Sequence, residues 1–396
     1  MDPEQLAALR TPDGVNALAT AAELAGGDPL SAAATLRSSG VPADLAAAAL
    51  TQAELRRRAA GKFGADAARM FFTRAGLEQA TRSVVAGRRA ARLRAAGVRT
   101  LADLGCGIGA DAIAAARSGI KVYALEADPG TAAVAAANAQ VLGLDDITVT
   151  HGDATAADLS GVDAVFCDPA RRRAGRRVFD PAAYSPPWDF VAALPERVPR
   201  TVLKLAPGVD HGLIPPGAEA EWVSVRGEVV EAAFWCGPLA DVPRRATLLG
   251  AGEYTLTGTG QAKAPVGEVG PYLYDPDGAV VRAHLVAEFA ATVAGHLADP
   301  EIAYVYTDAP TPTPYARCLK VDEVLPFSLK RLRALLRDRG VGRLEILKRG
   351  SALEPERLRR DLRLAGPSAA TLVLTRVAGA PTALLCQPLG GDVDTS

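Results

Sequence analysis

Apolar residues recur at three- and four-residue spacing through the first ninety-five residues, and this periodicity predicts helices. The pattern is clearest in EQLAALR, GVNALATAAELA and ADLAAAALTQAEL, and glycine-proline stretches separate these segments. From Gln52 the predicted helices become basic, in AELRRRAAGKFG and ARMFFTRAGLEQATRSVVAGRRAARLRAAG. Because alanine favours helix but buries little surface, we expect residues 1–95 to form a helical domain that packs on another part of the chain.

Short apolar runs alternate with helical patterns between residues 96 and 237. The predicted strands are Thr100–Leu104, Val122–Leu125, Ile147–Thr150, Ala164–Cys167 and Val202–Leu205. A helix over Pro129–Leu142 is marked by Asp128 directly before the proline. This alternation predicts a parallel sheet with helices on both faces. Two longer alternating runs follow, EWVSVRGEV and VEAAFWCG, and they predict an antiparallel β-hairpin after the fifth strand.

Residues 238–396 are predicted to form a third, α+β domain. Gly250–Leu273 is rich in glycine and threonine and is typical of short strands or loop, whereas Asp275–Gly295 has the spacing of a helix. The last eighty residues predict strand, helix, strand, helix, strand and strand, at Cys318–Val321, Ser328–Arg339, Arg343–Lys348, Pro355–Leu362, Thr371–Val377 and Ala383–Cys386. We therefore expect a ferredoxin-like sandwich there.

The charge distribution is uneven, although the formal net charge is only −1. Between Gln52 and Arg94 there are eleven Lys/Arg against three acids, and between Arg317 and Arg376 fifteen against seven. These two basic zones permit an anionic partner such as nucleic acid. The alternative is that they are solvated helix faces.

The five cysteines are dispersed and the four histidines are scattered, which predicts no metal site. The odd cysteine count favours reduced thiols, and hence a cytoplasmic protein. The start MDPEQL lacks the apolar core of a signal peptide, and no apolar run approaches the roughly 20 residues of a membrane span.

The stretch LADLGCGIGADA, Leu101–Ala112, joins the first predicted strand to a helix through three glycines. Gly105, Gly107 and Gly109 let the backbone turn tightly and lie directly against a ligand. The sequence therefore predicts a ligand site at the carboxyl end of this strand.

Further acids follow the next strands at the same predicted edge of the sheet: Glu126, Asp153 and Asp168. Gly105, Gly107 and Ala110 also fit the fingerprint of a dinucleotide site, with Glu126 as its ribose-binding acid. However, the carboxylate of Asp103 disfavours a pyrophosphate beside the turn. The pattern therefore favours a nucleoside that carries a sulfonium cation over a dinucleotide.

The motifs DLGCGIGAD, LEADP, HGDAT and FCDPARR resemble, in this order, those of class I S-adenosylmethionine-dependent methyltransferases. FFTRAGLEQATR before the turn, and LPFSLKRLRALL with LEILKRG near the end, resemble the bacterial members that have a THUMP-like C-terminal domain, here at about 315–390. The resemblance implies a Rossmann-like core, S-adenosylmethionine as cofactor, and an RNA base, in tRNA or rRNA, as methyl acceptor. It implies no metal.

The resemblance also implies roles for residues around the glycine turn. Asp103, Gly105, Cys106, Gly107 and Gly109 would cradle the methionine part and the ribose of the cofactor. Glu126 with Ala127 would bind the ribose hydroxyls, and Asp153 with Ala154 would border the adenine. Thr73 and Gln79 would reach the methionine carboxylate, unless their helix only packs on the sheet.

Asp168 and Pro169 are the predicted catalytic residues, since in amino-methylating relatives this motif accepts the two N–H groups of an exocyclic amine. Ala170 and Arg171 depart from the Pro and aromatic residue of those relatives. Phosphate binding is predicted for Arg171, Arg172, Arg173 and Lys204.

The segment Ser185-Pro186-Pro187-Trp188 also matches the amino-methylase motif, but it is better explained as a helix start with Ser185 as N-cap. On that interpretation Trp188 or Tyr184 would fold over the substrate pocket. Two other functions stay open: a methyltransferase for a small molecule or protein, and a non-catalytic nucleic-acid-binding protein that retains the fold.

Overall fold

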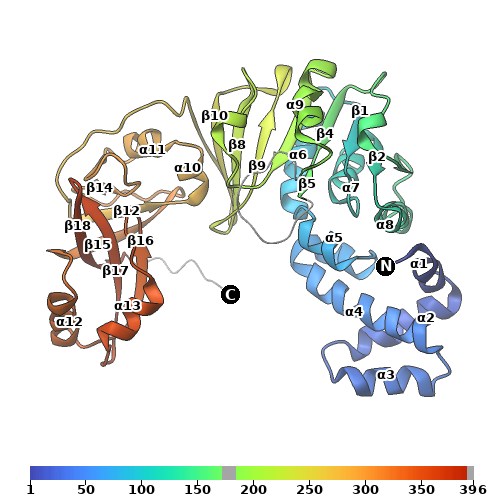
Figure 1. Ribbon diagram of the computed structural model, residues 1–396, viewed down its shortest axis with the longest axis horizontal. Helices are drawn as coiled ribbons and strands as arrows, with labels where there is room; N and C mark the ends of the chain where they lie inside the picture. Colours follow the sequence, from blue (N-terminus) through green and yellow to red (C-terminus); the bar gives the residue numbers. More distant parts are fainter. Residues whose placement is uncertain (172–183, 390–396) are drawn as a thin grey trace. The chain divides into compact units, whose positions relative to one another are not determined.

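The structure is a computed structural model that describes residues 1–171 and 184–389 (Figure 1). The chain divides into two compact units. The first unit contains Met1–Ala218 and Ala233–Asp241, and the second contains Glu219–Ala232 and Val242–Ser396.

The N-terminal region is helical, as its periodicity predicts. Its helices are α1 (Pro3–Leu9), α2 (Pro12–Leu24), α3 (Pro29–Ser38), α4 (Ala43–Phe63), α5 (Arg74–Gln79) and α6 (Ser83–Ala95), with a 3₁₀ turn η1 (Gly64–Ala68). Helices α1, α2 and α3 each start with a proline, and Asp2, Thr11 and Asp28 accept a backbone N–H of the first turn. The sequence pattern misleads at one point, because Phe71 and Phe72 lie outside any helix.

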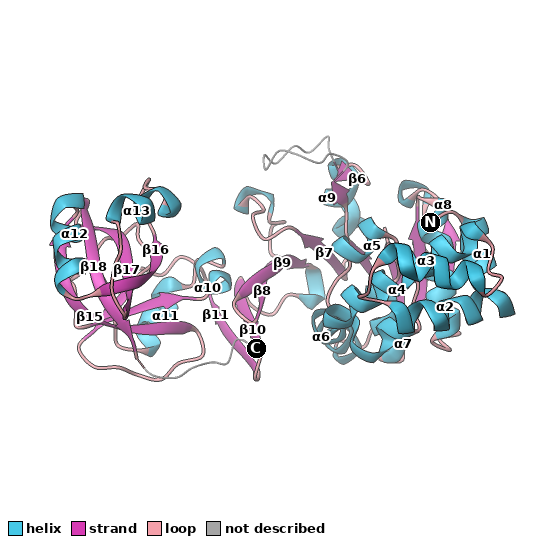
Figure 2. Ribbon diagram, turned by 90° about the horizontal axis from the view of Figure 1, so that it is seen from below, coloured by secondary structure: helices cyan, strands magenta, loops and turns pink. Residues whose placement is uncertain are grey.

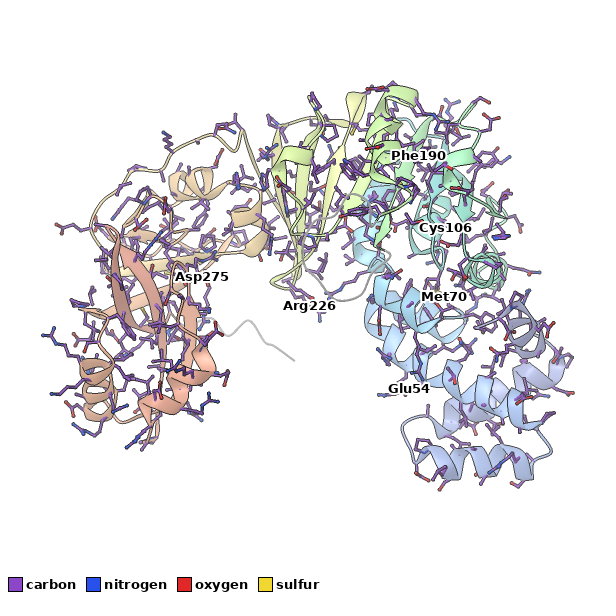
Figure 3. All side chains as sticks on the ribbon, in the orientation of Figure 1. Glu54, Met70, Cys106, Phe190, Arg226 and Asp275 are labelled. Atoms are coloured by element: carbon purple, nitrogen blue, oxygen red, sulfur yellow. The ribbon has the colours of Figure 1, made fainter. Side chains whose placement is uncertain are left out.

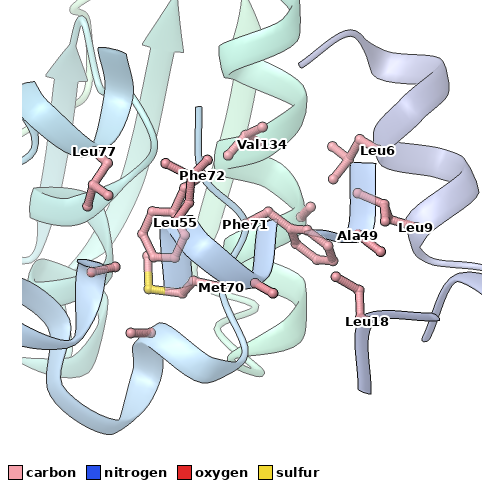
Figure 4. Close-up of a cluster of buried hydrophobic side chains, with 14 of the residues drawn as sticks. Leu6, Leu9, Leu18, Ala49, Leu55, Met70, Phe71, Phe72, Leu77 and Val134 are labelled. Carbon is pink, nitrogen blue, oxygen red and sulfur yellow. The ribbon is translucent and has the colours of Figure 1, made fainter. Parts of the chain in front are cut away.

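These helices bury their apolar face against the helices of the core, which confirms the expected packing on another part of the chain. Leu9, Leu36 and Phe72 are fully buried in one cluster with Val134 of α8 and Ile113 of α7. Figure 4 shows Leu6, Leu9 and Leu18 from the N-terminal helices in this cluster, together with Val134. The N-terminal region therefore shares one hydrophobic core with the elements that follow the glycine turn.

The core of the first unit contains the five predicted parallel strands. They are β1 (Thr100–Leu104), β2 (Lys121–Glu126), β3 (Ile147–His151), β4 (Ala164–Cys167) and β7 (Thr201–Leu205). Their order is β7-β4-β1-β2-β3, and each neighbouring pair is parallel. The helices are α7 (Ala110–Arg117), α8 (Pro129–Val141) and α9 (Trp188–Arg197), and Asp128 caps α8 as predicted. A two-stranded ladder pairs β5 (Ala170–Arg171) with β6 (Tyr184–Ser185).

The sheet is larger than the sequence pattern indicates. It continues through β9 (Glu228–Trp235), β8 (Glu219–Val225), β10 (Arg244–Leu249) and β11 (Glu253–Gly258), in the order β11-β10-β8-β9-β7-β4-β1-β2-β3. Strands β8 and β9 flank Arg226 and Gly227, whose φ angles of 51° and 81° suit a two-residue hairpin turn. The predicted hairpin is thus confirmed, while β10, parallel to β8, and β11 are additional.

The second unit also contains a seven-stranded sheet, ordered β13-β14-β12-β15-β18-β17-β16. Its strands are β12 (Tyr272–Pro276), β13 (His296–Leu297), β14 (Val305–Thr307), β15 (Ala316–Pro326), β16 (Val341–Lys348), β17 (Ser368–Val377) and β18 (Ala380–Pro388). The single helix predicted over Asp275–Gly295 is wrong: α10 (Gly278–Arg282) and α11 (Val286–Thr292) are separate. His284, with a φ of 60°, turns the backbone into the left-handed region between them.

Helices α12 (Leu329–Asp338) and α13 (Pro355–Leu362) cover one face of this sheet (Figure 2). Leu372 and Leu374 of β17 pack in the helix-side cluster, whereas Val373 packs in a cluster with tyrosines on the other face. The order strand, helix, strand, helix, strand, strand is confirmed. It differs from the ferredoxin-like β-α-β-β-α-β order, because α13 connects the parallel neighbours β16 and β17.

Candidate functional site

The glycine turn between β1 and α7 is held by the end of β2. The φ angles of Gly105, Gly107 and Gly109 are 83°, 57° and 90°, values at which a side chain is strained. The N–H groups of Gly105 and Cys106 both donate to the carbonyl of Leu125, at 2.9 and 3.0 Å. Figure 3 marks Cys106 on this turn. A Cβ added at Gly107 would have no protein atom within 4 Å, so the backbone at this glycine faces open space.

Glu126 lies at the end of β2 and fixes its carboxylate on backbone N–H groups. Oε2 accepts from Gly107 N–H and Oε1 from Asp128 N–H, both at 3.0 Å. The carbonyl of the adjacent Ala127 lies 3.1 Å from Nε2 of His151. The predicted ribose acid is therefore connected directly to the predicted glycine turn.

Asp103 is fully buried at the end of β1. Within the part of the chain that the structure describes, neither of its carboxylate oxygens has a hydrogen-bond partner. Burial raises the pKa of Asp103 well above its ordinary value of 3.8, and the carboxylates of Asp111 and Asp168 raise it further, against Arg89 and Lys204. A buried, unsatisfied carboxyl is costly, and a ligand that offers a donor or a positive charge would compensate it.

The remaining predicted cofactor residues lie at the starts and ends of short helical segments. Asp153 caps the 3₁₀ turn Ala154–Ala156 and accepts from Thr155 N–H at 2.9 Å, and Ala154 is buried. Thr73 is the N-cap of α5, where its hydroxyl accepts from Gly76 N–H, and Gln79 is exposed at the end of that helix. Contact of Asp153, Thr73 and Gln79 with a cofactor stays a prediction.

Asp168 follows β4, next to the glycine turn. A Cβ on Gly105 would lie 3.2 Å from the carbonyl oxygen of Asp168, so the two segments approach closely. The carboxylate of Asp168 forms an ion pair with Lys204 of β7, and Pro169 is buried. Lys204 thus contacts the predicted catalytic acid, and its predicted contact with phosphate stays a prediction.

The described residues include only part of the predicted arginine cluster. The backbone of Arg171 pairs with Tyr184 in the β5–β6 ladder, while Arg172 and Arg173 lie outside the described residues. The ladder places Tyr184 beside the segment after Asp168, and its ring centroid is 5.9 Å from that of Trp188. Ser185 as N-cap is wrong: it is paired in β6, and Pro187 precedes the first residue of α9.

Sequence reasoning missed a buried ion pair beside the turn. Arg89 of α6 pairs with Asp111 of α7, and their side chains are 4% and 12% exposed. The Thr81 hydroxyl donates to the same carboxylate at 2.6 Å, and the Arg89 guanidinium lies 4.6 Å from the ring centroid of Phe166. Asp111 follows the last glycine of the motif by two residues, and this position was the available signal.

The two cysteines near the site are both buried. Cys167 is fully buried directly before Asp168, and burial raises its pKa. Burial also raises the pKa of Cys106 well above its ordinary value, with Asp103 adding to the effect. Because the thiolate is the reactive form, neither residue is suited to covalent catalysis.

The two basic zones differ in how the fold uses them. In the first, Arg56 donates to the carbonyl of Met70, Lys62 to those of Leu77 and Glu78, and Arg92 to that of Leu239. In the second, the exposed faces of α12 and α13 carry Lys330, Arg331 and Arg360, and Arg363 directly follows α13; these four cations have no ion-pair partner among the described residues. Arg74 and Arg94 of the first zone are also exposed without such a partner among the described residues, but the second zone gathers its four cations on or beside two neighbouring helices, which makes it the candidate surface for an anionic partner.

Among the described residues no helix is long and apolar enough to cross a membrane. The same residues contain no cluster of three or more histidine, cysteine or acidic side chains arranged to hold a metal ion.

Three family models match the chain. Residues 101–176 match a methyltransferase domain, residues 316–388 a THUMP domain-like model, and residues 2–59 a domain of unknown function. An uncharacterized S-adenosylmethionine-dependent methyltransferase of Mycobacterium tuberculosis strain CDC 1551 is 37% identical over 359 residues, and the alignment covers 84% of this chain and 95% of the relative. The same identity and coverage hold for its counterpart in strain H37Rv.

A solved structure has the same fold over nearly the whole chain. It is a protein of Porphyromonas gingivalis W83 assigned as a methyltransferase, with a TM-score of 0.73 and 22% identity, covering 98% of this chain and 100% of that chain.

Proposed function

This chain belongs to the class I S-adenosylmethionine-dependent methyltransferases with a THUMP-like domain, and we propose that it methylates a base in RNA. S-adenosylmethionine is its cofactor. The observation that carries the RNA proposal is the unpaired basic surface on α12 and α13, inside the THUMP-like segment 316–388. THUMP domains present RNA to the catalytic domain to which they are attached.

The basic surface has the composition that phosphate binding requires. Leu332, Leu336, Leu358 and Leu362 anchor α12 and α13 on the sheet, which leaves the cations on the outer faces. Arg333 donates to the carbonyl of Asp361 and ties the two helices together. A fixed pair of cationic helices favours binding to a sugar-phosphate backbone over binding to a small neutral substrate.

The donor-site residues fit a cationic nucleoside. The unsatisfied Asp103 carboxyl, the Glu126 carboxylate and Asp153 are all hydrogen-bond acceptors, and the cofactor presents an ammonium group, ribose hydroxyls and an adenine amine. S-adenosylmethionine supplies an electrophilic methyl group, so the protein needs mainly to position the acceptor.

For the acceptor we propose that Asp168 accepts a hydrogen bond from the nucleophile of the base, beside the glycine turn. Lys204 fixes the Asp168 carboxylate through their ion pair and offsets its negative charge. Cys167, directly before Asp168, is fully buried and therefore poorly placed to attack a base, so we propose as acceptor a base nitrogen or oxygen that attacks the methyl group directly.

The test of the RNA proposal measures binding of full-length protein to bulk transfer RNA as a function of salt. Arg331→Gln/Arg360→Gln removes two exposed cations from α12 and α13, and Arg37→Gln/Arg58→Gln removes two exposed cations from the N-terminal helices. If both arginines contact phosphates, the salt slope of the first variant falls by about 1.4 to 1.8, at roughly 0.7 to 0.9 per contact. The second variant keeps the wild-type slope.

Equal losses in both variants, or no RNA binding by the wild type, would contradict the proposal and favour a small-molecule or protein acceptor. Titration with S-adenosylmethionine in both variants provides the control for folding.

A further inference from the structure

A short segment without regular secondary structure, residues 70–73, connects η1 to α5 and packs between the N-terminal helices and the core. Met70, Phe71 and Phe72 are at most 4% exposed, and Thr73 begins α5. Figure 4 draws the three buried side chains among those of the N-terminal helices and α8, and Figure 3 marks Met70 on the chain. We call residues 70–73 the strap. A buried strap outside regular structure must find partners for its backbone groups elsewhere.

Two buried amide side chains supply these partners from opposite sides. Gln52 of α4 accepts from Phe72 N–H at 2.9 Å and donates to the Phe72 carbonyl at 2.7 Å. Asn138 of α8 accepts from Phe71 N–H at 2.7 Å and donates to the Phe71 carbonyl at 3.1 Å. Gln52 and Asn138 are 2% and 0% exposed. Each amide thus satisfies both backbone groups of one strap residue, as a neighbouring strand would.

We call the side chains of Gln52 and Asn138 the two-amide clamp. A third hydrogen bond of Asn138 connects this clamp to the glycine turn. Its Nδ2 also donates to the carbonyl of Ile108, at 3.0 Å, in the turn between Gly107 and Gly109. Helix α5, which follows the strap, contacts the same turn residue: a Cβ on Gly76 would lie 2.4 Å from Cγ2 of Ile108. The strap, α5 and the glycine turn are therefore held in one arrangement.

We propose that the N-terminal helical region is a positioning element of the methyl-donor site and acts through this two-amide clamp. Gln52 lies within residues 2–59, the segment that matches a domain of unknown function, and it connects that segment to the strap. Asn138 transmits the position of the strap to the turn that faces the donor. The inference concerns cofactor binding alone and requires only that the donor lies at the glycine turn, so it does not depend on RNA as acceptor.

Replacing the amides of Gln52 and Asn138 with apolar side chains distinguishes a positioning role from simple packing. Apolar side chains of similar volume would fill the space around the strap but would satisfy none of its backbone groups. Leu36 of α3 is fully buried in the same N-terminal cluster and contacts neither the strap nor the turn through any hydrogen bond. Leu36→Ala therefore loosens the N-terminal region and leaves the clamp intact, which makes it the matched control.

The experiment titrates S-adenosylmethionine into the full-length protein by calorimetry and records thermal unfolding without ligand. For Gln52→Leu and for Asn138→Leu the dissociation constant should rise about tenfold, because the strap and the glycine turn are released in the free protein and must be ordered again when the cofactor binds. Leu36→Ala should lower the unfolding temperature and bind the cofactor like the wild type.

The double variant Gln52→Leu/Asn138→Leu should weaken binding by less than the product of the two single effects, because both changes release the same strap. Wild-type affinity in a folded Gln52→Leu or Asn138→Leu protein would overturn the proposal. So would an equal loss of affinity in Leu36→Ala, which would reduce the clamp to ordinary packing. Failure here leaves the RNA proposal untouched, because no acceptor is present in the titration.

Discussion

Replacing Gly107 with alanine separates the conformational role of the glycine turn from its role as a ligand surface. Gly107 has a φ of 57°, and a Cβ at this position would meet no protein atom within 4 Å. Gly143, in the turn after α8, has a φ of 70° and an equally open Cβ position. It lies at the end of α8 away from the β2 edge, at a distance of roughly 20 Å for a helix of 13 residues.

The two substitutions should therefore cost the same in stability and differ in ligand binding. Each places a Cβ in the left-handed region, which lowers the free energy of unfolding by about 1 to 2 kcal/mol. Neither adds a clash, since the space around both Cβ positions is empty of protein atoms. Only the Cβ of Gly107→Ala would stand between the backbone and the methyl donor, and we expect its dissociation constant for S-adenosylmethionine to rise by at least about tenfold, or 1.4 kcal/mol.

The assay pairs chemical denaturation of the ligand-free proteins with calorimetric titration of S-adenosylmethionine. Wild-type affinity in Gly107→Ala would refute the placement of the donor against this turn. An equal loss of affinity in Gly143→Ala would show that the effect arises from general loosening of the fold.

Three further predictions concern the charged groups around the turn. Arg89→Met leaves Asp111 buried without its cation and should lower the unfolding free energy by about 3 to 5 kcal/mol. The double variant Arg89→Met/Asp111→Leu, which removes both charges, should recover much of this loss. Equal denaturation midpoints for the wild type and Arg89→Met would count against a buried ion pair. The pKa of Asp103 is raised in the folded state, so its contribution to stability is complete below pH 3.8 and is lost as the pH rises through the folded-state value. The ligand-free Asp103→Asn protein should therefore lose less stability than the wild type between acidic and neutral pH, while it binds S-adenosylmethionine more weakly; parallel stability–pH curves would contradict this. Asp168→Ala should abolish methyl transfer and leave cofactor affinity nearly unchanged, and loss of cofactor binding would show that Asp168 belongs to the donor site.

The parallel core was predictable because its signals are local. Each strand is a short apolar run, and Asp128 marks the start of α8 by a cap that involves residues three positions apart. The acids Glu126 and Asp168 follow their strands directly, so the topology alone brings them to the edge with the glycine turn. Glu126 indeed binds the N–H of Gly107.

The strap and the ion pairs were not predictable, because their partners are distant in sequence. Phe71 and Phe72 fall in a helical pattern, and what keeps them extended are amides 67 and 20 residues away. Likewise, nothing in the sequence around Lys204 predicts that it pairs with an acid 36 residues earlier. The predicted helix over Asp275–Gly295 fails for a related reason, since the left-handed turn at His284 has no glycine to announce it.

Mass spectrometry of nucleosides from total RNA tests the central claim most directly. RNA from cells that lack the gene is compared with RNA from cells that express the wild type or Asp168→Ala. RNA methylation by this chain predicts one methylated nucleoside that is missing without the gene, restored by the wild type and not restored by Asp168→Ala. Identical nucleosides in all three samples would contradict an RNA acceptor.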